Sequence, residues 1–150
     1  MVWGFRRPAA RVVLLDKEKQ IFLVKGSDPM RPEKGTWWEI PGGGIEPGEK
    51  SEDAARRECL EETGCKVKKL ENILSYFPAP GSSESYYHLY LGEIDSFVGE
   101  KIFGHKDENE DILVKSYDVS EVKDLLNKKK IINGLTLIAL QWFFLQYYKD

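Results

Sequence analysis

Short apolar runs alternate along the chain with polar stretches rich in glycine and proline, a pattern typical of interspersed strands and helices. The expected strands are residues 9–15, 21–24, 36–40, 67–77, 86–94 and 112–117. The first two enclose the polar turn at 16–19 and therefore predict a hairpin. Together, these elements predict an α+β fold for residues 1–150 as a single domain, with a mixed sheet in an α/β/α sandwich.

Three further segments predict helices. Ser51 can act as the N-cap of a helix that runs to about Thr63, and Gly64 is suited to end it. Ser120 can cap a short helix through residue 126, and residues 131–148 predict a mostly helical C-terminal segment. The polar stretches between elements predict loops at 26–35, 45–49, 78–83 and 96–110. The Pro-Gly-Gly-Gly run at 41–44 cannot lie inside a helix.

Composition and charge narrow the class of protein. The 150 residues, 41% of them hydrophobic, are enough for one domain with a real core. No stretch approaches the roughly 20 apolar residues of a membrane span, and the N-terminus does not resemble a signal peptide. The net charge of −3 offers no electrostatic case for nucleic-acid binding. Two cysteines, Cys59 and Cys65, suggest no disulfide framework, so we expect a reduced, cytoplasmic protein.

Three carboxylates stand out within the first predicted helix. Glu58, Glu61 and Glu62 follow the i, i+3, i+4 spacing, so they share one face of the helix. Like charges at this spacing destabilise a helix, and a hard divalent cation is an obvious way to offset the repulsion. A bound cation would also let a phosphate substrate approach an otherwise repulsive acidic surface. The alternative is a solvated acidic face with no ligand.

Residues 43–65 resemble the signature of the Nudix hydrolases. The signature has a glycine, a glutamate after five residues, and Arg-Glu-apolar-any-Glu-Glu-any-Gly-apolar after seven more. Its fixed positions are met by Gly43, Glu49, Arg57, Glu58, Glu61, Glu62 and Gly64. Cysteine fills both apolar positions, where it packs as a small hydrophobe. The resemblance implies a Nudix fold and a metal-dependent enzyme in which water attacks phosphorus in a nucleoside diphosphate linked to another group.

Other segments are similar to ADP-ribose pyrophosphatases within this family. They are the proline-glycine loop at 78–84, the acidic loop at 107–112 and the C-terminal segment at 131–142. The resemblance implies ADP-ribose or another nucleoside diphosphate sugar as substrate, with Mg²⁺ or Mn²⁺ as cofactor. Those enzymes usually carry an extra N-terminal β-region, whereas this chain begins almost directly at the core, which favours nucleoside triphosphates as the alternative substrate. A non-catalytic binding module is a third possibility, opposed by the intact glutamates.

The resemblance also implies roles for individual residues. The candidate metal ligands are Glu58, Glu62, Glu61, the backbone carbonyl of Gly42, and Glu110. The candidate catalytic residues are Glu108, as the base that activates water, with Glu61 and Arg57. For Arg57, an ion pair with Glu49 that ties loop to helix is the preferred role, and phosphate binding the weaker one. A flexible acidic loop is the alternative reading of Glu108 and Glu110.

Candidate substrate-binding residues are spread over several loops and strands. They are Glu84, Gly81, Trp38 and Arg31. Trp38 could stack on a nucleobase, although core packing is the commoner use of a tryptophan. Arg31 could receive phosphate charge, although a solvated surface arginine is commoner. The aromatic C-terminal segment reads first as core and second as the surface of a possible homodimer.

Overall fold

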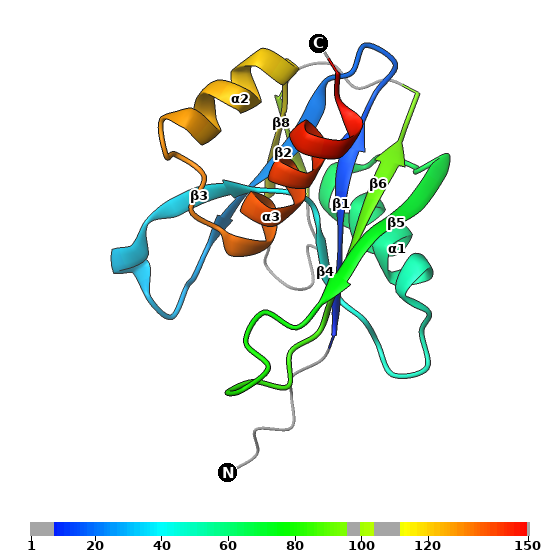
Figure 1. Cartoon of the computed structure of the whole chain (residues 1–150), viewed down its shortest axis with the longest axis vertical. Coiled ribbons are helices and arrows are strands. Elements are labelled where there is room, and N and C mark those ends of the chain that lie inside the picture. The colour runs from blue at the N-terminus through cyan, green and yellow to red at the C-terminus, as the bar shows by residue number, and fades with distance from the viewer. Residues whose placement is uncertain (1–7, 96–99, 104–111, 150) are drawn as a thin grey trace.

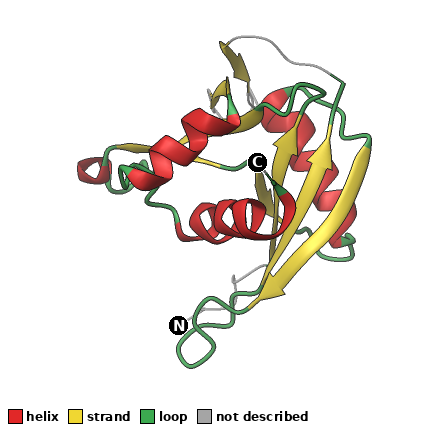
Figure 2. Ribbon diagram, turned by 45° about the horizontal axis from the view of Figure 1, so that its top comes forward, coloured by secondary structure: helices red, strands yellow, loops and turns green. Residues whose placement is uncertain are grey.

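The computed structural model describes residues 8–95, 100–103 and 112–149, and it places an eight-stranded mixed sheet between helices (Figures 1 and 2). The strand order is β5-β6-β1-β2-β8-β7, with β4 paired to β1 and β3 paired to β2. The strands are β1 (Ala9–Leu15), β2 (Ile21–Ser27), β3 (Thr36–Glu39), β4 (Gly42–Gly44), β5 (Lys69–Tyr76), β6 (Tyr87–Glu93), β7 (Glu100–Phe103) and β8 (Ile112–Tyr117). The helices are η1 (Pro32–Lys34), α1 (Ser51–Thr63), α2 (Val119–Asn127) and α3 (Gly134–Trp142), the last followed by a π-helical turn at Phe143–Tyr147.

Two hydrophobic cores lie on the two faces of the sheet. Val12 and Leu14 of β1 belong to the core beneath α1, whereas Val13 and Leu15 belong to the core beneath α2 and α3. This alternation is the period-2 pattern of a strand buried on both faces. Figure 2 shows α1 on one side of the strands and the other helices on the opposite side. The expected α+β sandwich is therefore confirmed.

The predicted hairpin of the first two strands exists at its tip alone. The register between β1 and β2 is the single pair Leu15 and Ile21. Beyond it the strands diverge: β1 pairs with β4 and runs parallel to β6, while β2 pairs with β3 and β8. Most of the backbone partners of β1 and β2 therefore come from other strands rather than from each other.

Two predicted helix caps are wrong. Lys50, not Ser51, is the N-cap of α1, and the Ser51 hydroxyl hydrogen-bonds the Tyr90 hydroxyl instead. In α2 the N-cap is Asp118 rather than Ser120. Its N–H donates to the Glu121 carboxylate at 3.0 Å, so the pair at Ncap and N3 outcompetes the serine two residues later.

Other boundaries also differ from the sequence expectation. The glycines at 42–44, for which the sequence excluded only a helix interior, form β4, because backbone pairing to β1 needs no side chains. β7 lies within the stretch expected to be a loop, and β2 continues to Ser27. The C-terminal helix begins at Gly134, three residues later than predicted, with Asn133 as its N-cap. Among the helices of the described residues, none is long and apolar enough to cross a membrane.

A buried hydroxyl joins α3 to the turn between β3 and β4. The Ile40 N–H donates to Thr136 Oγ1 at 3.1 Å, and that hydroxyl donates to Asn133 Oδ1 at 2.9 Å. Thr136 and Ile40 are both fully buried. Because a buried N–H without a partner is costly, this bond holds the corner from which β4 emerges.

We expect Thr136→Val to destabilise the fold by about 1–3 kcal/mol, because the Ile40 N–H then loses its acceptor. Thr136→Ser keeps the hydroxyl and is the control; it should lose only about 1 kcal/mol for the missing methyl group. Urea unfolding of the purified variants measures both. Equal losses in the two variants would contradict the role given to the hydroxyl.

Candidate active site

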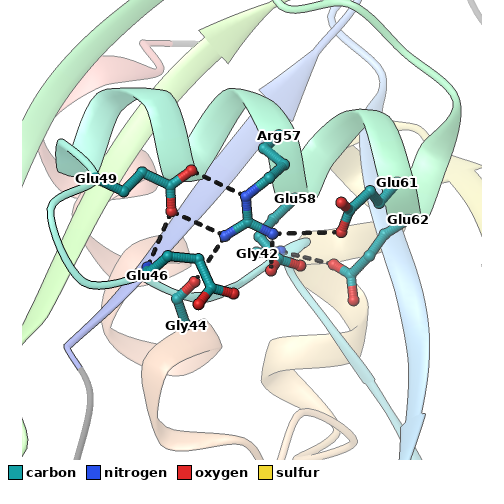
Figure 3. A network of polar contacts seen from close by, with 8 residues as sticks. All are labelled: Gly42, Gly44, Glu46, Glu49, Arg57, Glu58, Glu61 and Glu62. Carbon is teal, nitrogen blue, oxygen red and sulfur yellow. Dashed lines mark hydrogen bonds and ion pairs between the residues drawn. The ribbon is translucent and has the colours of Figure 1, made fainter. Parts of the chain in front are cut away.

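Strand β4 and helix α1 approach closely because β4 consists of glycine. Gly42 has φ of +150°, and a Cβ there would lie 2.5 Å from the Arg11 Cα. A Cβ at Gly43 would lie 2.5 Å from the carboxylate carbon of Glu58. The Gly42 N–H donates to Glu62 Oε1 at 2.7 Å (Figure 3). Glycine therefore lets the main chain of β4 contact the helix carboxylates directly.

Arg57 lies at the centre of the site and connects the loop before α1 to the helix. Its Nε and Nη2 donate to the two oxygens of Glu49 at 2.9 and 3.0 Å, a bidentate pair. Nη2 also donates to the Gly44 carbonyl at 3.0 Å. Nη1 contacts Glu58 at 2.8 Å and Glu61 at 3.4 Å. Figure 3 shows the guanidinium between these groups. The pair with Glu49 has the geometry that the Nudix resemblance implies.

The carboxylates of the site divide into two electrostatic environments. The hydrogen bond from Arg57 lowers the pKa of Glu49 to about 2. Burial instead raises the pKa of Glu62 to about 7, although Arg11 and the Gly42 N–H act in the opposite direction. Burial also raises the pKa of Glu58, against the opposing effect of Arg57. Burial therefore makes the charge of Glu62 costly, and it does so at Glu58 even though Arg57 lies 2.8 Å away.

This charge distribution bears on the metal site expected from the sequence. Arg57 itself offsets the repulsion between Glu58 and Glu61, an arrangement that the spacing argument did not anticipate. Within the part of the chain that the structure describes, no three acidic, histidine or cysteine side chains converge closely enough to enclose a metal ion. Glu58 and Glu62 nevertheless fit a hard divalent cation, since they offer partly buried carboxylate oxygens at one end of the helix.

Five other candidate residues lie outside this network or outside the described part of the chain. Glu108 and Glu110 lie outside the described residues. Glu84 and Gly81 are exposed in the connection between β5 and β6, and a Cβ at Gly81 would meet nothing within 4 Å. Gly64 ends α1 at φ of +72°, its N–H donating to the Leu60 carbonyl.

The substrate candidates between β2 and β3 have partners within the protein. Arg31 forms an ion pair with Asp28 at 3.3 Å in the connecting loop. The Trp38 ring lies edge-on to Tyr117 at a centroid distance of 5.7 Å and packs against the core beneath α2 and α3. These contacts match the structural alternatives for Arg31 and Trp38, and their roles toward substrate stay predictions.

Arg11 is a residue of the site that the sequence analysis missed. Its Nη1 donates to the Ile40 carbonyl at 2.8 Å and lies 3.6 Å from Glu39. Its Nε is buried and has no hydrogen-bond partner among the described residues. Glu39 in turn accepts from Asn133 Nδ2 at 3.1 Å. The sequence did contain a signal for Arg11, because it is the one charged residue within the apolar strand at 9–15. A charge buried in such a strand needs a partner.

Comparison with known proteins identifies the family. The NUDIX domain model matches residues 5–136. The chain belongs to the Nudix family. Its resemblance at residues 43–65 is thereby confirmed. It is 38% identical over 146 residues to an ADP-ribose pyrophosphatase of Haemophilus influenzae, covering 93% of this chain and 67% of the relative. A similar protein of the same name from Escherichia coli (strain K12) is 38% identical over 109 residues, covering 73% of this chain and 52% of the relative.

This chain therefore spans between half and two thirds of the length of these two relatives. A crystal structure of an ADP compounds hydrolase superposes with a TM-score of 0.73 at 22% identity, covering 94% of this chain and 75% of the other. At that identity the likeness supports the fold alone.

We expect Glu49→Gln to lower the melting temperature at neutral pH, because the bidentate pair with Arg57 is lost. The pKa of Glu49 is lowered on folding, so its stabilising effect is fully present above its ordinary value of 4.5 and is lost as the pH falls through about 2. The difference in melting temperature between the wild type and Glu49→Gln should therefore become smaller as the pH falls from 4.5 to 2. Thermal unfolding across this range measures it, with the exposed Glu18→Gln as control. A deficit independent of pH would contradict the ion pair.

Proposed function

We propose that the chain is a single-domain, Mg²⁺-dependent Nudix pyrophosphohydrolase that cleaves the diphosphate of ADP-ribose or a related nucleoside diphosphate sugar. The observation that carries the substrate class is the 38% identity to a protein named ADP-ribose pyrophosphatase over 93% of this chain. The family match over residues 5–136 and the single sheet shared by both cores support one domain.

In this proposal, some of the described residues hold the loop before α1 in place and others bind the cation. Arg57 and Glu49 hold the loop before α1 against the helix, and the Gly44 carbonyl extends that contact to β4. Glu58 and Glu62 are the proposed ligands of Mg²⁺, or of Mn²⁺ in its place, because burial raises the pKa of both, and Glu61 is a further candidate on the same helix face. A divalent cation bound there would supply the positive charge that a diphosphate needs in this acidic site.

In the proposed reaction, water attacks one phosphorus of ADP-ribose and the bridging P–O bond breaks, giving AMP and ribose 5-phosphate. The Nudix resemblance assigns removal of the proton from water to Glu108, and a further metal contact to Glu110. A base that acts on water needs only short reach and the right protonation state, which an acidic loop can supply.

We also propose a homodimer and a cytoplasmic location. Ile132 and Leu145 support a dimer surface at the C-terminal segment, since they are exposed by 62% and 71%. The two cysteines are free and buried, which fits a reducing compartment.

The substrate is tested by a product assay with Mg²⁺ on ADP-ribose, other nucleoside diphosphate sugars, diadenosine polyphosphates and nucleoside triphosphates. We expect ADP-ribose to yield AMP and ribose 5-phosphate. Turnover of triphosphates alone would overturn the proposed substrate.

The metal ligands are tested by Glu58→Gln and Glu62→Gln. Each should lower kcat by roughly 100-fold or more, since several kcal/mol of charge stabilisation are at stake and each 1.4 kcal/mol is a factor of ten. Binding of Mn²⁺, followed by electron paramagnetic resonance, should weaken in both variants. Glu52→Gln, an exposed change in the first turn of the same helix, is the control. Full Mn²⁺ affinity in both variants would argue against these residues as ligands.

A further inference from the structure

The corner between β3 and β4 is held by side chains as well as by the sheet. The Ile40 N–H donates to Thr136 Oγ1, and the Ile40 carbonyl accepts from Arg11 Nη1 at 2.8 Å. The Val12 N–H donates to the Pro41 carbonyl at 2.9 Å. Proline has no N–H to return this bond, so the ladder between β1 and β4 has one bond here where another residue would give two. The Arg11 side chain therefore adds a contact where the ladder lacks one.

The Arg11 side chain also occupies the space that Gly42 leaves open. Arg11 lies opposite Gly42 in the register of β1 and β4, and a Cβ at Gly42 would lie 2.5 Å from both Cα and Cγ of Arg11. Bonded and non-bonded pairs alternate along antiparallel strands, so the bonded pair of Val12 and Pro41 directs the Gly42 N–H away from β1. That N–H donates to Glu62 at 2.7 Å (Figure 3). Gly42 is therefore enclosed between Arg11 on the β1 side and Glu62 on the other.

Glu39 and Asn133 hold the Arg11 guanidinium in one direction. Arg11 Nη1 lies 3.6 Å from Glu39, and the two side chains are only 18% and 13% exposed. Glu39 also accepts from Asn133 Nδ2 at 3.1 Å. Asn133 lines an aromatic cavity of about 460 Å³ beside Tyr76, yet both ends of its amide bond the protein, Nδ2 to Glu39 and Oδ1 to Thr136. The direction of the guanidinium is thus set from the N-cap of α3.

Arg11 costs the fold free energy at one atom. Its Nε is buried and has no hydrogen-bond partner among the described residues. A buried donor without a partner is unfavourable, and an apolar residue at this strand position would avoid that cost. Val13, two residues along β1 and on the same face, is such a residue and is fully buried. The arginine is therefore better explained by its contacts around Gly42 than by a contribution to stability.

We propose that Arg11 is a positioning residue for the metal site. It holds the β3–β4 corner so that the Gly42 N–H meets the Glu62 carboxylate and orients it. The inference rests on the proposed function for the metal ion at Glu58 and Glu62. Groups that orient a metal ligand without touching the metal typically change its affinity by roughly 10- to 100-fold.

The test compares two substitutions at Arg11 with one at a second arginine. Arg11→Met removes the guanidinium and keeps an unbranched side chain beside Gly42. Arg11→Lys keeps the positive charge without the planar guanidinium, so it separates geometry from charge and carries the test if Arg11→Met does not fold. The matched control is Arg56→Met. Arg56 Nη1 likewise donates to a main-chain carbonyl, that of Val67, at 2.6 Å, and takes no part in the β3–β4 corner.

The first readout is the NMR signal of the Gly42 amide proton in the metal-free protein with EDTA. We expect it to move upfield in both Arg11 variants, because its hydrogen bond to the Glu62 carboxylate weakens. Glu62→Gln should move it in the same direction and calibrates the effect. The amide of Leu14, which is buried in the same strand as Arg11, should stay unchanged, as should Gly42 in Arg56→Met.

The second readout is Mn²⁺ binding, followed by electron paramagnetic resonance. A positioning role predicts a dissociation constant raised about tenfold in Arg11→Met and raised also in Arg11→Lys. A role as a charge alone predicts tighter binding in Arg11→Met, because a nearby cation repels the metal ion, and no change in Arg11→Lys. A role in stability alone predicts a lower urea midpoint with the Mn²⁺ affinity of the wild type.

The outcomes separate this inference from the proposed function. No binding of Mn²⁺ to the wild type would overturn the proposed metal site, and with it this role for Arg11. If the wild type binds Mn²⁺, an unmoved Gly42 amide in a folded Arg11 variant would overturn the inference and leave the proposed function intact. Unchanged or tighter Mn²⁺ binding in a folded Arg11 variant would do the same.

Discussion

The close contact between strand β4 and helix α1 is the constraint on which the site depends. Gly42 and Gly43 have no side chains, and a Cβ at either position would meet Arg11 or Glu58 at 2.5 Å. Their absence lets a main-chain N–H reach Glu62 and lets the Gly44 carbonyl reach Arg57. Because β4 is held on its other side by β1, the helix carboxylates are placed relative to the centre of the sheet rather than to a loop.

Arg57 divides the carboxylates of this site into two kinds. Arg57 bonds Glu49 in the bidentate geometry that favours a fully charged pair, and the pKa of Glu49 falls to about 2. Glu62 has no such partner among the described residues, and burial raises its pKa to about 7. One part of the network is therefore satisfied within the protein, whereas the other is suited to receive positive charge from a ligand.

The two faces of the sheet have separate roles in this arrangement. The face beneath α1 carries the acidic site, and the face beneath α3 carries an aromatic cavity whose polar neighbour Asn133 is tied to Glu39 and Thr136. Thr136 also holds the main chain at Ile40, the corner between β3 and β4. The same short segment of α3 therefore shapes the cavity and positions the strand that meets helix α1.

The sequence by itself determined the local elements and the family, because both depend on residues that lie close together along the chain. Apolar runs marked most strands, and the spacing of Glu49, Arg57 and Glu58 carried the Nudix signature. Only the tertiary structure decided which elements meet. It separated the expected hairpin, paired three glycines with β1 and brought Arg11, Glu39 and Asn133 together across the chain. Those contacts join residues up to 94 positions apart, and their partners are selected by packing and burial, which no local spacing encodes.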